Sequence, residues 1–95
     1  MLNLLNNQNE NIRALSLKNL AKMSDVSLLP IFVKYASNDE STEVRREAVS
    51  AIGRLRNEKA IPTLIKFLTD DDPKVVMQAI RGLLVFANRQ DIKQE

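Results

Sequence analysis

An internal repeat, with a period of 32 and then 31 residues, constrains this chain more than any other feature. In three aligned segments a small residue is followed by large apolar residues one, four and seven positions later. The small residues are Ser16, Ala48 and Ala79. The large residues are Leu17, Leu20 and Met23, then Val49, Ile52 and Leu55, then Ile80, Leu83 and Phe86. This spacing forms one stripe of an α-helix, so the sequence predicts three equivalent helices.

A second repeated segment lies between these helices. Leu29-Pro30 and Ile61-Pro62 open matching segments at an offset of 32 residues. Proline is favoured in the first turn of a helix, where it costs no hydrogen bond, so each repeat is predicted to be a helical hairpin. We expect a single domain, 1–95. In it, residues 1–6 are the end of the second helix of a hairpin, 9–37 and 41–69 are repeats, and 72–95 is an incomplete repeat. The last five residues of the chain, from Asp91, are predicted to start the second helix of that incomplete repeat.

Boundary residues repeat with the same period. Asn9, Ser41 and Asp72 occupy matching positions and have the side chains that cap helix N-termini. Asn57 and Asn88 follow the first helices of their repeats, where a residue with positive φ is favoured. Alternating strand patterns and Asn-Gly or Asp-Gly hairpin turns are absent from the sequence. The sequence therefore predicts an all-α protein.

The middle repeat carries a recognisable pattern. It reads Val-Arg-x-x-Ala-x-x-Ala-Ile-Gly from Val44 and Ile-Pro-x-Leu-x-x-x-Leu-x-Asp from Ile61. This pattern resembles the short HEAT-like repeat of the PBS-lyase type, and the resemblance spans essentially the whole chain. It implies an α-α superhelix, a HEAT-like solenoid of about three helical-hairpin repeats, in which neighbouring repeats bury each other's apolar faces.

The resemblance also implies a ladder of ion pairs along the stack. In the family, an arginine in the first helix pairs with an aspartate in a turn between repeats. By this likeness Arg13 and Arg45 are ladder arginines, and Asp39 and Asp70 are their candidate acidic partners. Val76 stands where a third arginine would be and Asn7 where another aspartate would be, so we expect the ladder to be interrupted at both ends.

The amino-acid composition excludes most kinds of enzyme active site. The chain has no cysteine and no histidine, which excludes disulfides, thiolate or imidazole metal ligands and the commonest general base. We find no nucleophile with a base to activate it and no glycine loop for phosphates, and we interpret Asp70-Asp71-Asp72 as a helix start. The sequence thus predicts a protein that is not an enzyme and has no cofactor or metal. It has no apolar run long enough to span a membrane, and we expect a cytoplasmic protein.

One surface combines cations with aromatic rings. Lys34-Tyr35 and Lys66-Phe67 occupy the same place in successive second helices, which line the concave face in solenoids of this type. With Thr63, these residues form the predicted partner-binding site of a protein-interaction scaffold. Helical counting places Leu64, Ile65 and Leu68 in the buried stripe and Phe67 at its margin. The alternative is that the two rings only fill space between repeats.

Three further hypotheses remain open. A basic edge could bind nucleic acid, although the net charge is only +2. Some relatives named with this repeat are subunits of bilin lyases, so the chain could be a non-catalytic subunit of such a complex. Homo-oligomers could form through the uncapped ends. The basic edge comprises Lys22, Arg54, Arg56, Lys59 and Arg89. The outer face of the first helices is a separate surface, which we interpret as solvated, and it comprises Arg46, Glu47, Ser50, Arg54 and Gln78.

Overall fold

The structure, a computed structural model, describes the backbone of residues 2–94 and the side chains of residues 4–87. Residues 2–94 form helices and turns without a strand, which confirms the predicted all-α class. The α-helices are α1 (Glu10–Ala21), α2 (Leu29–Asn38), α3 (Thr42–Arg54), α4 (Ile61–Lys66) and α5 (Pro73–Gln94). Short 3₁₀ helices are η1 (Leu2–Asn6), η2 (Val26–Leu28), η3 (Glu58–Ala60) and η4 (Phe67–Thr69).

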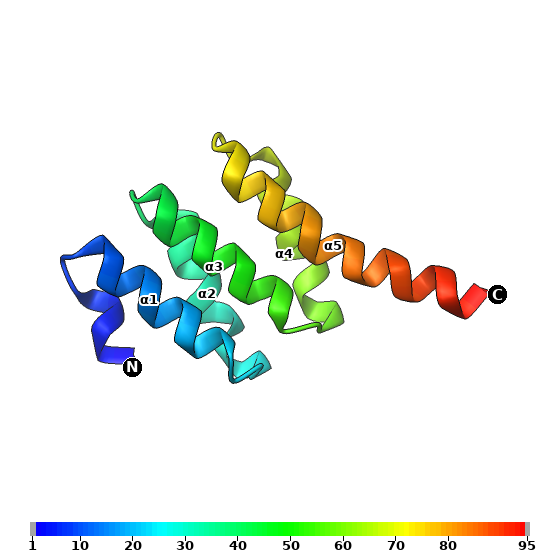
Figure 1. The fold of residues 1–95 in the computed structure, drawn as a ribbon, viewed down its shortest axis with the longest axis horizontal. Coiled ribbons are helices and arrows are strands. Elements are labelled where there is room, and N and C mark those ends of the chain that lie inside the picture. The colour runs from blue at the N-terminus through cyan, green and yellow to red at the C-terminus, as the bar shows by residue number, and fades with distance from the viewer. Residues whose placement is uncertain (1, 95) are drawn as a thin grey trace.

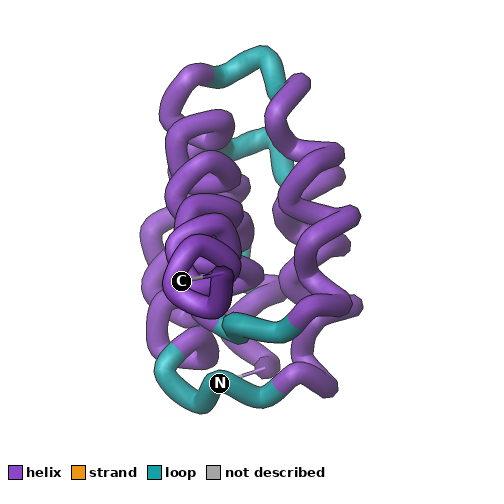
Figure 2. Tube along the Cα trace, turned by 90° about the vertical axis from the view of Figure 1, so that its right-hand side faces the viewer, coloured by secondary structure: helices purple, strands orange, loops and turns teal. Residues whose placement is uncertain are grey.

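The helices form two layers. In the first, α1, α3 and α5 lie side by side and run in the same direction (Figure 1). The second layer contains η1, α2 and α4, and the two layers stand against each other in the turned view (Figure 2). The molecule measures 48 × 28 × 16 Å. Successive hairpins are thus stacked in parallel, which is the arrangement of a helical repeat.

Polar side chains start the first-layer helices at the predicted positions. The Asn9 side chain accepts a hydrogen bond from the backbone N–H of Asn11 at 2.8 Å, and that of Asp72 accepts one from Lys74 at 2.8 Å. Ser41 Oγ accepts a longer one, 3.4 Å, from the N–H of Val44. These bonds satisfy N–H groups that have no partner inside the helix, so the three predicted caps are confirmed.

The ends of the first-layer helices differ from the prediction. Arg56 and the equivalent Ser24 have a φ of 50°, whereas Asn57 has a φ of −118°. The Asn57 side chain instead accepts a hydrogen bond from the N–H of Lys59 at 2.9 Å, which starts η3. The chain reverses one residue earlier than predicted because the asparagine is used to cap the next element.

Helix α5 also ends later than predicted. It continues through Asn88 as far as Gln94, so the predicted turn and the new helix from Asp91 are wrong. Lys93 stands at the position matched by Pro62 in the preceding repeat, and a lysine does not interrupt a helix as a proline does. The side chain of Asn88 lies outside the described residues.

The core follows the repeated stripe best in the middle of the stack. In α3, Val49 and Ile52 are fully buried, as is Leu17 in α1. The stripe is less well covered elsewhere: Met23, its last position in the first segment, is 62% exposed, and Ile80 in α5 is 39% exposed. Each hairpin is therefore covered by its neighbours rather than by its own two helices.

A close contact between two glycines joins α3 to α5. A Cβ atom placed on Gly53 would lie 3.2 Å from the Cα of Gly82. One placed on Gly82 would lie 2.9 Å from Leu64 Cδ1, and Leu64 is fully buried. The two helices approach this closely only because both positions lack a side chain.

Candidate functional site

The first predicted ladder pair is a two-point contact between α1 and the turn before α3. Arg13 Nε lies 2.9 Å from Asp39 Oδ2, and Arg13 Nη2 lies 3.0 Å from Asp39 Oδ1. Arg13 Nη1 also donates to the carbonyl oxygens of Asn7 at 2.9 Å and Gln8 at 3.0 Å. The hydrogen bonds that Arg13 donates to the Asp39 carboxylate raise the pKa of Arg13 above its ordinary value. One guanidinium therefore joins three segments of the chain.

The second predicted pair also lies within ion-pair distance, but Arg45 contacts two aspartates, and at longer distances. Arg45 Nε lies 3.5 Å from Asp70 Oδ2, and Arg45 Nη2 lies 3.5 Å from Asp71 Oδ1. Arg45 Nη1 donates to the carbonyl oxygens of Asp39 at 3.1 Å and Glu40 at 3.4 Å. The four ladder residues thus link consecutive repeats as two rungs.

The α2/α4 face, which we define as Lys34, Tyr35, Thr63 and Lys66, contains most of the predicted partner-binding residues. The two lysines are exposed, while Tyr35 and Thr63 are half-buried. Lys34 Nζ lies 5.6 Å from the centre of the Tyr35 ring, within the range of a cation–π interaction. The Tyr35 hydroxyl donates to Asn6 Oδ1 at 3.2 Å, which ties α2 to η1.

Phe67 does not belong to this surface. Its side chain is only 4% exposed, whereas Ile65 is 53% and Leu68 is 37% exposed. The predicted stripe on α4 was therefore wrong at Ile65 and Leu68. The helix tightens to 3₁₀ at Phe67, and in that geometry residues three apart eclipse each other, so Phe67 follows Leu64 into the core. It still supports the face, because Lys66 Nζ lies 5.7 Å from its ring centre.

The predicted basic edge is only partly a separate surface. Lys22, Arg54, Arg56 and Lys59 are exposed, and the side chain of Arg89 lies outside the described residues. Arg54 and Arg56 also line a hollow between α3 and α5. The edge is therefore continuous with the outer face of the first layer.

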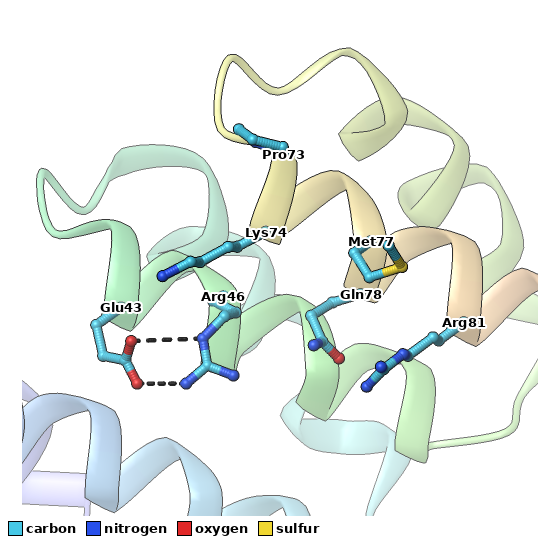
Figure 3. A pocket seen from close by; sticks show the side chains of 7 residues that line it. All are labelled: Glu43, Arg46, Pro73, Lys74, Met77, Gln78 and Arg81. Atoms are coloured by element: carbon cyan, nitrogen blue, oxygen red, sulfur yellow. Dashed lines mark hydrogen bonds and ion pairs between the residues drawn. The ribbon is translucent and has the colours of Figure 1, made fainter.

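That outer face is grooved, which the sequence did not predict. A groove of about 530 Å³ lies between α3 and α5 and is shown in Figure 3. Smaller hollows of about 140 and 200 Å³ border it. We call these three hollows together the α3/α5 groove. Their charged and polar lining comprises Lys18, Glu43, Arg46, Glu47, Ser50, Arg54, Arg56, Lys74, Gln78 and Arg81.

Arg46 is held in place at one side of this groove. Its guanidinium forms a two-point contact with Glu43 (Figure 3) and lies 3.3 Å from Glu47 Oε2. The hydrogen bond from Arg46 lowers the pKa of Glu43, and the same bond raises the pKa of Arg46. Both carboxylates of the groove are therefore paired with one arginine, and the three groups together have a net charge of −1.

The sequence contained one signal for the groove. Lys74, Met77, Gln78 and Arg81 follow the spacing of a single helix face, and all four line the groove. Only Gln78 of these was assigned to the outer face, because the hollow depends on how closely α3 and α5 approach at their glycines.

Within residues 2–94, no helix is both long and apolar enough to cross a membrane. Among the described side chains, no group of three carboxylates is placed to hold a metal ion.

Comparison with known proteins agrees with the stacked hairpins. A search of curated proteins found no significant match. The sequence profile of HEAT repeats matches residues 1–87, which is most of the chain. With its parallel hairpins and its all-α architecture, the chain belongs to the family of HEAT repeats.

Proposed function

We propose that this chain is a non-catalytic scaffold that binds another protein through its α2/α4 face. HEAT repeats commonly mediate protein interactions. The observation that carries the proposal is the matched register of two lysines, each set beside an aromatic ring, on consecutive second-layer helices. Such a surface offers two exposed cations and one half-buried ring, that of Tyr35, and tyrosine is enriched in binding hot spots.

The stack presents this surface in a fixed shape. The Arg13 rung ties α1 to the turn before α3, and the Tyr35 hydroxyl ties α2 to η1. Binding to a preformed surface loses less side-chain and backbone entropy than binding to a flexible one. Lys34 and Lys66 would contact acidic groups of the partner, while Tyr35 and Thr63 would lie against its apolar and polar atoms.

A pair of double variants tests this proposal. Lys34→Glu with Lys66→Glu reverses both cations of the face, and Lys22→Glu with Lys59→Glu makes the same charge change on the exposed basic edge. Each protein is used for quantitative affinity capture from extract of the cells that produce it. We expect the first variant to lose the specific partner and the second to retain it, with thermal unfolding unchanged in both.

Other results would contradict the α2/α4 face. Equal capture by both variants would show that the two lysines are not in the interface. Loss of capture only with the Lys22 and Lys59 variant would move the site to the basic edge, and nucleic acid that binds the wild type but not this variant would favour the alternative function.

A further inference from the structure

The α3/α5 groove has a defined centre. Gln78 and Arg81 line all three of its hollows. They lie near the middle of the exposed side of α5, and Figure 3 shows both side chains directed across the groove toward α3. A ligand anywhere in the groove would therefore lie close to the Arg81 guanidinium.

The groove concentrates positive charge. Its cations are Lys18, Arg46, Arg54, Arg56, Lys74 and Arg81, and its carboxylates are Glu43 and Glu47. These eight groups have a net charge of +4, whereas the whole chain has a net charge of +2. The remainder of the molecule is thus slightly acidic, and an anionic ligand would be directed to this face.

The charges are not distributed evenly along the groove. Glu43 lies at the end where α3 and α5 begin, beside Pro73 and Lys74, whereas the hollow at the other end has no carboxylate among its described lining residues. Arg54 and Arg56 lie at the opposite end, where α3 finishes. Between them Met77, 49% exposed, offers an apolar contact. A ligand that fits must combine carboxylates at one end with an apolar group near the middle.

We propose that the α3/α5 groove binds an acidic peptide segment of a partner protein, independently of the α2/α4 face. Carboxylates of the segment pair with Arg54, Arg56 and Arg81, and an apolar side chain packs on Met77. A nucleic-acid backbone fits less well, because its evenly spaced phosphates would meet Glu43 and Glu47 and would leave Met77 without a complementary contact.

The groove is shaped before binding. Its floor contains Gly53 and Gly82, which are in close contact with each other. Arg46 is fixed by Glu43 and Glu47. At least one wall of the groove therefore already has the geometry that it would have with a peptide bound, which lowers the entropic cost of association.

Fluorescence anisotropy tests the proposal directly. The probe is a fluorescein-labelled peptide of glutamates with interspersed leucines, and the proteins are the wild type, Arg81→Glu and the control Lys22→Glu. Lys22 is exposed on the same layer but does not line the groove. We expect Arg81→Glu to weaken binding about tenfold or more and Lys22→Glu to weaken it less than about threefold.

Two further probes separate the ligand classes. A peptide in which serines replace the leucines should bind several-fold more weakly, because it loses the contact with Met77. A labelled double-stranded oligonucleotide should bind more weakly than the glutamate–leucine peptide at the same salt concentration. Circular dichroism of each variant checks that the helices are intact.

The proposal is overturned by any of three results. The peptide could fail to bind the wild type, it could bind Arg81→Glu as tightly as the wild type, or the oligonucleotide could bind more tightly than the peptide. None of these results bears on capture through the α2/α4 face, so failure here and failure of the proposed scaffold function are distinguishable.

Discussion

Asp39 performs two separate tasks in the turn between repeats. Its carboxylate pairs with Arg13, and Oδ1 also accepts a hydrogen bond from the N–H of Ser41 at 2.9 Å. Asn7 occupies the equivalent turn and accepts the same kind of hydrogen bond from Asn9 at 2.8 Å. An asparagine can therefore do the second task without the charge needed for the first.

This separation allows a clean test of the ladder. Asp39→Asn should keep the turn but lose the charged pair, whose side chains are only 13% and 7% exposed. We expect a loss of about 1.5–3 kcal/mol in the free energy of unfolding. Asp71→Asn is the matched control, because Asp71 is 94% exposed and should cost no more than about 0.5 kcal/mol. Urea unfolding measures both, and equal losses would contradict a stabilising role for the ladder.

The ion pair at Glu43 predicts a dependence on pH. Its hydrogen bond with Arg46 lowers the pKa of Glu43 below the ordinary 4.5. The unfolded chain then takes up the proton more readily, so the contribution is present above pH 4.5 and is lost as the pH falls through the lowered pKa. Glu43→Gln should make stability fall less steeply below pH 4.5 and should leave its slope unchanged near neutrality.

Urea unfolding at a series of pH values measures these slopes. Glu58→Gln, an exposed position on η3, controls for the loss of one negative charge. A slope below pH 4.5 that is the same in Glu43→Gln and in the wild type would show that the pair with Arg46 does not stabilise the fold.

At the scale of helices, the α3–α5 contact depends on the absence of side chains. Gly82→Ala would place a methyl group 2.9 Å from Leu64 Cδ1 and 3.2 Å from Gly53 Cα. Overpacking of this kind costs about 1–3 kcal/mol, and the better helix propensity of alanine offsets about 1 kcal/mol. We expect a net loss of about 1 kcal/mol, which lowers the melting temperature by about 4–8 °C. A rise in melting temperature would show that the helices are farther apart.

The existence of the helices was predictable because the sequence signals for a helix start are local. The caps at Asn9, Ser41 and Asp72 and the prolines at Pro30 and Pro62 act within one turn of chain. The structure has the predicted hairpins between these residues. The burial of the apolar stripe was predictable in the middle repeat, because neighbouring repeats cover it on both sides.

Features that depend on helix geometry or on neighbours were not predictable. The burial of Phe67 follows from a 3₁₀ turn at the end of α4, and counting residues on an ideal α-helix cannot show it. The groove follows from the close approach of Gly53 and Gly82, which are 29 residues apart in the sequence. The predicted ladder residues lie within ion-pair distance, but their assignment came from family resemblance rather than from a local pattern.

At the scale of the whole molecule, the two proposed binding faces lie on opposite sides of a thin stack. The α2/α4 face belongs to the second layer, whose helices α2 and α4 lie behind the first layer in Figure 1, and the α3/α5 groove is lined by helices of the first layer. The shortest dimension is 16 Å. Sites on separate faces with no shared residues should behave additively, so a scaffold of this shape can hold two ligands at once.

The stacking of parallel hairpins is the claim on which both faces depend, and nuclear Overhauser spectroscopy tests it most directly. The fold predicts cross-peaks between the α-protons of Gly53 and those of Gly82, and between the α-protons of Gly82 and the methyl groups of Leu64. These contacts join α3 to α5 and α4 to α5. A well-dispersed spectrum that lacks both sets of cross-peaks would contradict the stack and would remove the groove and the α2/α4 face together.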